Sequence, residues 1–497
     1  MLTSPTAPHR KRRSSAKSVV ALAFGICALV LSPLRSPPAV SKETNSAATP
    51  AAGEPGSPVP EATPFLGNIE LKGHLDAPGR LTIAGERMHA ALLRRFYTAH
   101  EYQTVWDNHP AERTRLWEAV LRAGDQGLDP GLFHSAVLGE HGPTLSLVER
   151  DLLLSDAFLS YADALSRGAM PIEDRADDED LTPAPVDIVA VLDAAIGSPD
   201  PATAVEVLAP SSPEYQALRR AYLEYRAVAQ GGGSSRVPGA RNRPEQNRAS
   251  AEKRARQLAI NLERMRWLPR HMPQDRVVVN SATARLQVFR EDRPVFTTRV
   301  VVGELDKQTP EFQAAVTNIL YNPPWNIPRS IMQKEILPKL ASDPDYLNRH
   351  HMRFRTSTSI QQIPGPESAL GQLKFEMPNR YDVYLHDTPS KSLFQSVARM
   401  MSHGCVRVEN PRALAALLLG QSTEAINKGI ALGYTNRRAL PGAMPIFIVY
   451  QTAYVESDGS IQFRGDPYER DDEIWQHLTR SQQPPLAQQS APSQRKG

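Results

Sequence analysis

Residues 277–303 read VVVNSATARLQVFREDRPVFTTRVVVG, a stretch in which short β-rich runs alternate with turn residues. In its middle run, Ala284, Leu286 and Val288 alternate with polar side chains. A period of two is typical of a strand with one buried face. The later run IFIVY, residues 446–450, is continuously apolar and fits a buried strand. These patterns predict a mainly β, sandwich-like domain in the second half of the chain.

The first half of the chain shows a different periodicity. Residues 66–230 contain apolar stripes at helical spacing, of which the clearest joins Leu154, Phe158, Tyr161 and Leu165. Spacings of three and four residues place these side chains on one face of a helix. We interpret the stripes as helix core rather than as a ligand groove. The chain is therefore expected to be a multidomain α+β protein, in which a mainly α-helical domain precedes the β domain.

Three segments lack the apolar residues that a folded core requires. They are the Pro-rich segment 42–65, the Gly- and Ser-containing segment 231–250 and the Gln- and Pro-rich segment 481–497. Such compositions indicate flexible linkers and tails. They delimit a second folded domain over residues 251–456, which is followed by an extension over residues 457–480.

The N-terminus has the pattern of an export signal. Its first 17 positions carry basic but no acidic residues, and residues 18–34 are uncharged and mostly apolar. A basic region before a short apolar run is typical of a secretory signal, and Ala39 and Ser41 offer small residues for cleavage. A helix of this length spans about 25 Å, which is marginal for a membrane core of about 30 Å. Residues 1–41 are thus expected to be a cleaved signal peptide or an uncleaved anchor.

The composition excludes several classes of protein. Lys and Arg total 57 against 54 Asp and Glu, which gives a net charge of +3, whereas a general nucleic-acid binder needs a concentrated basic face. The chain has 2 cysteines, Cys27 within the N-terminal apolar run and Cys405. This number excludes a disulfide-rich scaffold and a metal site built from several cysteines. The exported portion carries Cys405 alone, so this thiol has no partner for an intramolecular disulfide.

The side chains that could carry out catalysis are concentrated in residues 384–411, which read YLHDTPSKSLFQSVARMMSHGCVRVENP. A nucleophilic thiol such as that of Cys405 needs a general base, and His386 and His403 are the histidines of this segment. The thiol also needs N–H donors for an oxyanion, and Gly404 lets a substrate carbonyl approach the backbone closely. The concentration of these groups favours a catalytic site.

Two other interpretations of this segment stay open. Cys405 could be an inert buried thiol, with both histidines serving as hydrogen-bonded polar residues. His386, His403 and Cys405 could also ligate a catalytic zinc ion, for which three protein ligands suffice. No paired metal motif such as HExxH accompanies them in the sequence.

The spacing of the segment resembles that of a known family. His386, 15 further residues and then SHGCVR at 402–407 resemble the signature of the L,D-transpeptidases, which carry a YkuD-type catalytic domain. The resemblance covers essentially all of residues 255–456 and is to the long Gram-negative branch of that family. Other segments that share it are NLERMRWLPR (261–270), VVVGELDKQTPEF (300–312), YNPPWNIPRSI (321–331), EILPKLASDPDYL (335–347) and QQIPGPESALGQLKF (361–375). In the helical half, RGAMPIEDR (167–175) resembles the scaffold domain of the same branch.

The resemblance implies a reaction on peptidoglycan. Cys405 would attack the carbonyl that joins meso-diaminopimelate to the terminal D-Ala of a tetrapeptide stem, release D-Ala and form an acyl-enzyme. An amine of a neighbouring stem would then resolve the acyl-enzyme as a 3→3 cross-link. His386 would act first as general base and then as general acid, with the backbone carbonyl of Asp387 orienting its imidazole. The N–H groups of Gly404 and Cys405 would form the oxyanion hole.

Further residues acquire expected roles from the same resemblance. Ser402 would support the catalytic loop, and His403 would line the pocket as a secondary polar group. Arg407 would either anchor the loop by hydrogen bonds or face a substrate carboxylate, and Tyr384 and Trp325 would line the substrate pocket. No cofactor and no metal is required. The expected partners are peptidoglycan stem peptides, with carbapenem-type β-lactams as covalent inhibitors and no nucleic acid.

The chain departs from the family pattern in two places. No peptidoglycan-binding domain fits into residues 231–250, so wall binding would fall on the scaffold and catalytic surfaces. Residues 329–375 would form a compact lid, whose Pro and Gly residues suit turns and hinges. The resemblance places the protein in the periplasm, tethered to the inner membrane if its N-terminal segment is not cleaved.

Two alternative functions stay open at this point. An L,D-carboxypeptidase or a D-amino-acid exchanger would form the same acyl-enzyme and differ only in the acceptor. A non-catalytic wall-binding protein would keep the fold and lose the chemistry, although every residue of the motif is present in this chain.

Overall fold

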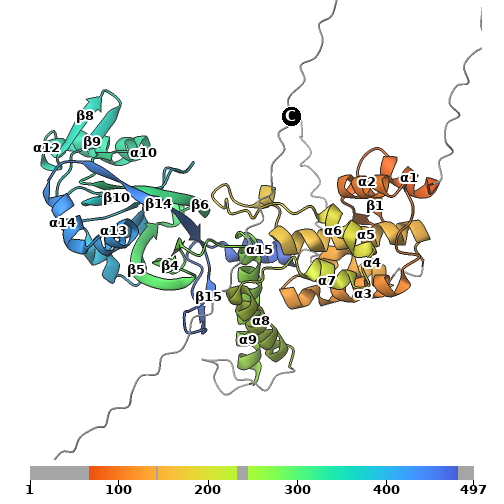
Figure 1. Cartoon of the computed structure of the whole chain (residues 1–497). Helices are drawn as coiled ribbons and strands as arrows, with labels where there is room; N and C mark the ends of the chain where they lie inside the picture. Colours follow the sequence, from red (N-terminus) through yellow and green to blue (C-terminus); the bar gives the residue numbers. More distant parts are fainter. Residues whose placement is uncertain (1–66, 141–143, 232–243, 480–497) are drawn as a thin grey trace, which may run out of the picture. The chain divides into compact units, whose positions relative to one another are not determined.

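The computed structural model describes residues 67–140, 144–231 and 244–479 (Figure 1). The predicted signal or anchor, the Pro-rich linker and the C-terminal tail lie outside these residues, as does most of the predicted linker 231–250. Among the described residues, no helix combines the length and the apolar character needed to cross a membrane.

The helical domain is built around one long, buried helix, α5 (Leu147–Arg167). It begins with a capping box, in which Ser146 and Glu149 each accept the other's backbone N–H. Phe158 and Leu165, which belong to the stripe that predicted this helix, are fully buried. The other helices of the domain are α1 (Ile69–Asp76), α2 (Ala90–Ala99), α3 (Pro110–Leu121), α4 (Ser135–Glu140), α6 (Ile188–Ile196) and α7 (Pro201–Glu206). A short hairpin joins β1 (Thr82–Ile83) to β2 (Glu86–Arg87).

Helices α8 (Pro213–Ala229) and α9 (Pro244–Arg266) pack against each other through a small core of their own. Its buried members include Tyr215, Leu218, Leu258, Leu262 and Met265. Helix α9 begins inside the predicted linker, so that prediction was wrong for residues 244–250. This stretch reads PEQNRAS; its Glu, Gln, Arg and Ala are good helix formers, but its polar composition also resembles that of a linker. Packing of the later, apolar turns of α9 decides the outcome.

The β-rich domain is organised around a nine-stranded sheet in the order β12-β5-β13-β11-β10-β6-β14-β3-β4. Strand β4 also pairs with β5, so the sheet closes on itself around the core, a detail that the sequence pattern did not indicate. The strands are β3 (Arg276–Asn280), β4 (Arg285–Arg290), β5 (Arg293–Gly303), β6 (Phe312–Tyr321), β10 (Leu373–Glu376), β11 (Leu385–His386), β12 (Met400–Ser402), β13 (Val406–Val408) and β14 (Asn436–Val449).

The core of this domain follows the alternation seen in the sequence. Leu286 and Val288 on β4 are fully buried, whereas Gln287 between them is partly exposed. Helices α13 (Pro411–Leu419) and α14 (Thr423–Ala431) lie beside the sheet in Figure 1 and bury apolar side chains in the same core. This packing gives the strands that carry the functional segment a rigid support.

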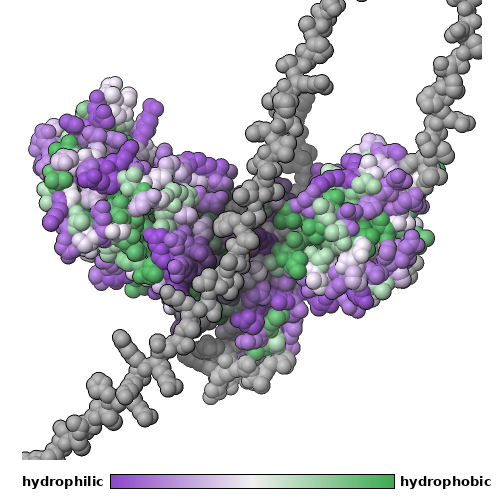
Figure 2. All heavy atoms as spheres, in the orientation of Figure 1, coloured by the Kyte–Doolittle hydropathy of each residue, from purple (hydrophilic) through white to green (hydrophobic). Residues whose placement is uncertain are grey.

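The predicted lid forms a small unit with its own apolar core, which includes Ile327, Met332, Ile336 and Ile360. Its three-stranded sheet has the order β7-β9-β8, and hydrophilic residues cover much of it in the view of Figure 2. Its elements are β7 (Trp325–Asn326), α10 (Arg329–Ile331), a π-helical turn (Met332–Ile336), α11 (Leu337–Ser342), α12 (Tyr346–Arg349), β8 (Met352–Thr356) and β9 (Ser359–Gln362). The lid therefore begins at β7, earlier than predicted, and ends before Leu373, which belongs to the main sheet.

The extension after β14 packs mainly against helices α8 and α9, and its Tyr468 reaches the core of the main sheet. It contains β15 (Ala453–Val455), β16 (Ile461–Phe463) and α15 (Asp471–Leu478). Between β16 and α15, the hydroxyl of Tyr468 donates to the carbonyl of Gly303 at 2.7 Å and accepts the N–H of Thr309 at 3.3 Å. Tyr468 therefore fixes the turn that follows β5.

Candidate active site

Strand pairing brings the two halves of the functional segment together. Strands β11 and β13 are parallel neighbours, with Leu385 opposite Val406 and His386 opposite Arg407. Leu385 and Val406 are fully buried in the core. Because side chains alternate along a strand, His386 and Arg407 lie on the opposite face, and Cys405 directly precedes β13. The sheet thus places a histidine, a cysteine and an arginine on one surface.

The imidazole of His386 is buried and held in one orientation. Its Nδ1 lies 2.6 Å from the carbonyl oxygen of Asp387, so Nδ1 carries the proton and Nε2 has a free lone pair. Burial, and then the positive charge of Arg407, lower the pKa of His386 to about 3. The ring is therefore neutral at neutral pH and able to accept a proton at Nε2.

The carboxylate of Asp387 fixes the backbone that carries this carbonyl. Its Oδ2 accepts the N–H of Gln372 at 2.9 Å, and its Oδ1 accepts the N–H of Thr388 at 2.7 Å and the ammonium of Lys391 at 2.6 Å. Gly371 lies directly against this carboxylate, and a Cβ at that position would be 2.5 Å from the Asp387 Cγ. The position also has a φ of +58°. Glycine is required here by both space and conformation.

The thiol of Cys405 is protonated in the resting structure. Burial raises its pKa, although the interactions with Tyr384 and the charges of Lys374 and Arg407 oppose this effect. Its Sγ lies 3.9 Å from the carbonyl oxygen of Asp382. Within the described residues no hydrogen bond joins this Sγ to His386, and such contacts often tighten only when substrate binds. The resting pair is a thiol and a neutral imidazole.

The loop between β12 and β13 is held by hydrogen bonds to Ser402, at its own start, and to Thr309, from another part of the chain. Ser402 is buried; its Oγ donates to the carbonyl of Cys405 at 2.6 Å and accepts the N–H of Gly404 at 3.2 Å. Thr309 donates to the carbonyl of Gly404 at 2.8 Å, and Gly404 has a φ of +106°. The expected oxyanion hole changes accordingly. The Gly404 N–H is already bound to Ser402, whereas no described group accepts the Cys405 N–H.

His403 faces the lid rather than a catalytic partner. Its Nε2 lies 2.5 Å from a carboxylate oxygen of Glu335, which belongs to the π-helical turn of the lid. Sequence reasoning missed Glu335, because a single charge on a short helix carries no distinguishing pattern. His403 therefore links the catalytic loop to the lid, and its expected role as a lining residue stays a prediction.

Tyr384 and Trp325 lie at this surface. The Tyr384 ring stands 5.7 Å from the His386 ring, edge to face. Burial raises the pKa of the Tyr384 hydroxyl, which interacts with both Cys405 and Trp325. The phenol, just before β11, thus borders the thiol, and the indole of Trp325 on β7 contacts that phenol.

Two cations complete the surface. Arg407 has a buried Nε without a hydrogen-bond acceptor among the described residues, which does not support the expected anchoring role for this nitrogen. Lys374 on β10 pairs in register with His386, and its Nζ lies 3.8 Å from the centre of the Tyr384 ring. Sequence reasoning missed Lys374, because its position in a strand looks like that of any outward-facing residue.

A metal site is not formed by these side chains. No group of three His, Cys, Asp or Glu residues with the geometry of a metal site occurs in the part of the chain that the structure describes. His403, one of the conceivable zinc ligands, is bound to Glu335.

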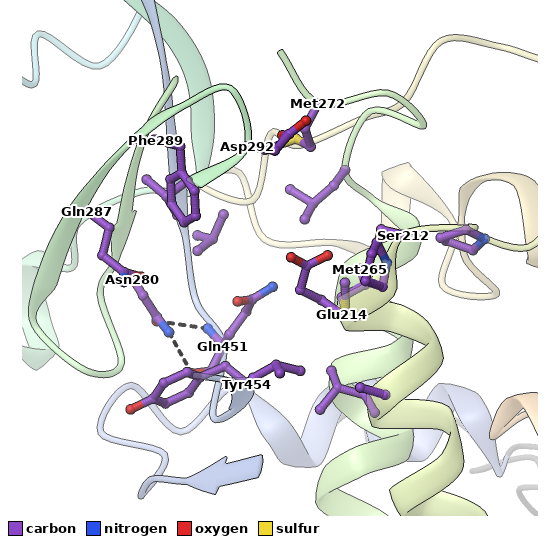
Figure 3. Close-up of a pocket in the computed structure, with 18 of the residues that line it drawn as sticks. Ser212, Glu214, Met265, Met272, Asn280, Gln287, Phe289, Asp292, Gln451 and Tyr454 are labelled. Carbon is purple, nitrogen blue, oxygen red and sulfur yellow. Dashed lines mark hydrogen bonds between the residues drawn. The ribbon is translucent and has the colours of Figure 1, made fainter. Parts of the chain in front are cut away.

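A separate cavity of about 960 Å³ is lined by residues of α8, β3, β4 and the segment around β15 (Figure 3). At its wall, the Asn280 amide donates to the carbonyl of Gln451 at 3.0 Å, and the Gln451 N–H donates back at 3.0 Å. None of the candidate catalytic residues lines this cavity. The candidate site is therefore the surface around Cys405.

Comparisons with known proteins agree on one family. Residues 274–439 match the family model of the L,D-transpeptidase catalytic domain, YkuD, and residues 91–221 match that of the scaffold domain. A putative L,D-transpeptidase from Haemophilus influenzae is 32% identical over 240 residues, which cover 44% of this chain and 48% of the relative. The match thus spans about half the length of that curated relative.

Solved structures of low similarity carry the same family name. An L,D-transpeptidase from Mycobacterium smegmatis matches with 12% identity and a TM-score of 0.21, covering 35% of this chain and 58% of its own. An L,D-transpeptidase in complex with imipenem matches with 12% identity and a TM-score of 0.21, covering 35% of this chain and 59% of its own.

Proposed function

Because residues 274–439 form an L,D-transpeptidase catalytic domain and residues 91–221 a scaffold domain, we propose that the protein is a peptidoglycan L,D-transpeptidase that acts through an acyl-enzyme on Cys405. The observation that carries this proposal is the pairing of β11 with β13. This pairing sets a neutral, carbonyl-oriented imidazole beside the strand that Cys405 directly precedes.

The first half of the reaction forms the thioester. The Sγ of Cys405 attacks the carbonyl of the diaminopimelate residue in a tetrapeptide stem, while His386 Nε2 takes the thiol proton. The Cys405 N–H stabilises the oxyanion. When the amide bond breaks, the imidazolium of His386 gives its proton to the departing nitrogen, and D-Ala leaves as a free amino acid. The C–N bond is thus exchanged for a C–S bond, with no redox change.

The second half transfers the acyl group to an amine. The side-chain amine of a neighbouring stem attacks the thioester, His386 accepts a proton from it, and Cys405 leaves as a thiol after this proton returns to sulfur. The product is a 3→3 cross-link. The neutral state of His386, whose pKa is about 3, is the state that both proton acceptances require.

The test is product analysis with purified muropeptides. Wild-type protein incubated with a disaccharide tetrapeptide is expected to release D-Ala and to form a 3→3 dimer, whereas Cys405→Ala forms neither. A tripeptide without dimer would show that water is the acceptor and would replace the transpeptidase by an L,D-carboxypeptidase. Exchange of D-Ala for an added D-amino acid would identify an exchanger. No turnover by folded protein would favour a wall-binding role.

We also propose that carbapenems acylate the same thiol. A strained β-lactam carbonyl fits the same attack by Cys405, and ring opening leaves a covalent adduct. Mass spectrometry of the peptide that contains Cys405 is expected to show the adduct, and its persistence in Cys405→Ala would contradict the mechanism.

The proposed substrate requires that the catalytic domain act in the periplasm, either free or tethered by residues 1–41. Fractionation of cells that express the full chain, together with protease treatment of spheroplasts, tests that location.

A further inference from the structure

Lys374 lies on the same face of the sheet as the proposed nucleophile and base. Strand β10 pairs with β11 so that Lys374 stands directly opposite His386. Its neighbours along the strand, Leu373 and Phe375, are fully buried in the core, so the lysine side chain extends toward the catalytic surface. This placement follows from register alone and does not depend on a flexible loop.

The ammonium of Lys374 rests on an aromatic ring. Its Nζ lies 3.8 Å from the centre of the Tyr384 ring, a distance at which a cation is attracted by the ring face. The same tyrosine interacts with Cys405. The ring therefore holds a positive charge at the edge of the reaction site.

Among the described residues, no carboxylate forms an ion pair with this ammonium. Glu376 and Asp382 attract the charge of Lys374 from beyond ion-pair distance, and Glu376 is itself paired with Arg437 at 3.1 Å. Burial lowers the pKa of Lys374, which shows the cost of keeping the charge there. A partly buried, unpaired cation is stabilised when an anion binds.

The proposed donor peptide supplies such an anion. Two carboxylates flank its scissile bond, one on the terminal D-Ala and one on the side chain of diaminopimelate. We propose that Lys374 determines donor specificity by binding one of these carboxylates through its ammonium group. This inference rests on the proposed function and adds a recognition residue to it.

Activation of the Cys405 thiol explains the position of Lys374 less well than binding of a substrate carboxylate does. The pKa of Cys405 stays raised in spite of the nearby charge of Lys374. A lysine whose main task was to stabilise the thiolate would leave that pKa lowered. The direction of this pKa therefore does not favour thiolate stabilisation as the main role of Lys374.

The experiment combines three donors with four proteins. The donors are the tetrapeptide L-Ala-γ-D-Glu-meso-diaminopimelate-D-Ala, its D-alaninamide analogue and its analogue amidated on the diaminopimelate side chain. The proteins are the full-length wild type, Lys374→Met, Lys374→Arg and the control Lys428→Met. Lys428 is an exposed lysine on α14, so its substitution removes the same charge from a residue outside the candidate site. The readouts are KM and kcat for release of D-Ala or D-alaninamide.

For the wild type, one of the two amides is expected to react about 10- to 100-fold less well in kcat/KM than the free acid, mostly through KM. The amide that does so identifies the carboxylate. Lys374→Met should lose a similar factor on the free acid and nothing on that amide, Lys374→Arg should retain part of the preference, and Lys428→Met should match the wild type. Alkylation of Cys405 by iodoacetamide between pH 6 and 10 should be alike in wild type and Lys374→Met.

Two results overturn the inference. One is an equal loss on all three donors in Lys374→Met, and the other is a shifted alkylation profile without loss of donor preference. Either result leaves the proposed function standing, provided that the wild type turns over the tetrapeptide. If the wild type releases no D-Ala from any donor, the proposed function itself fails.

Discussion

His403 joins the catalytic loop to the lid, because its Nε2 lies 2.5 Å from the carboxylate of Glu335. Both side chains are about one-third exposed, and a contact between such exposed polar side chains contributes at most about 0.2–1 kcal/mol. A contact of this strength can open at a small cost in free energy. It also explains why a histidine two residues from Cys405 need not be its base.

We predict a small, shared effect of removing this pair. Glu335→Ala and His403→Ala should each lower kcat/KM on a peptide donor by up to about fivefold, which corresponds to about 1 kcal/mol. The double variant should be no worse than the worse single variant, because both changes delete one contact. The measurement is a double-mutant cycle on kcat/KM. Multiplying effects would show that the two residues act independently.

Removal of the proposed base should be far more damaging. We predict that His386→Ala lowers the rate of acylation by a carbapenem at neutral pH by about 10²–10⁴-fold, as expected for a lost general base. His403→Ala serves as the matched histidine variant and should stay near the wild type. Rapid-quench mass spectrometry gives the rates, and circular dichroism checks the fold. If His403→Ala is the more damaging change in folded protein, the roles of the two histidines are reversed.

The pH dependence of acylation should lack the inflection of an ordinary histidine. For a base with a pKa near 6.5, the fraction in the neutral form would fall about tenfold between pH 7.5 and pH 5.5. The pKa of His386 is lowered to about 3, first by burial and then by Arg407, so the neutral form persists over this range. We predict a nearly flat single-turnover rate from pH 7.5 to 5.5.

Arg407→Gln should shift the pH profile of acylation in a defined direction. Removing this charge should raise the pKa of His386 and move the acidic limb of the profile toward higher pH. A wild-type limb centred near pH 6.5 would contradict the burial argument.

The fit between Gly371 and Asp387 should be visible in stability. Gly371→Ala places a Cβ 2.5 Å from the Asp387 Cγ at a φ of +58°, and we predict a loss of about 1–3 kcal/mol in the free energy of unfolding. Acylation should fall as well, because Asp387 orients His386. The control is Gly365→Ala, where nothing lies within 4 Å of an added Cβ. Urea denaturation should separate the two, and equal curves would disprove the packing argument.

A buried cluster in the scaffold domain should make stability depend on pH. Burial alone would lower the pKa of His134, but its hydrogen bonds to Asp156 and Glu86 raise it to about 9. A histidine with a raised pKa stabilises the fold fully below its unfolded pKa of about 6.5, and this stabilisation is lost as the pH rises through about 9. We predict that the melting temperature falls between pH 7 and 10, and falls less in His134→Gln. Parallel curves for both proteins would exclude this cluster as the cause.

Local patterns in the sequence predicted the parts of the molecule that local physics determines. The alternation of Leu286 and Val288 with polar residues predicted β4, and the stripe through Phe158 predicted α5, because burial on one face imposes a period. Closure of the sheet depends on the pairing of β4 with β5, a non-local contact that no period reveals. The start of α9 was missed because helix formers and linker residues share a polar composition.

The candidate site divides in the same way. Its motif residues stand in one continuous segment, which indicated Cys405 and two candidate histidines, and the resemblance to the L,D-transpeptidases singled out His386. Lys374 and Glu335 come from a strand and a lid turn that only the tertiary structure brings to that segment. The hydrogen bond between Gly404 and Ser402 was beyond prediction, because it depends on the conformation of one loop.

The hydrogen bonds of Tyr468 to the turn after β5 affect the order in which the loop that carries Cys405 can form. A ribosome makes the chain from its N-terminus, so Cys405 is synthesised 63 residues before Tyr468. Thr309, which holds the carbonyl of Gly404, itself depends on the Tyr468 hydroxyl. An incomplete chain therefore carries its thiol on an unfinished loop. The loop that carries Cys405 can therefore take the described arrangement only once the segment around Tyr468 has been made and has packed against the turn after β5.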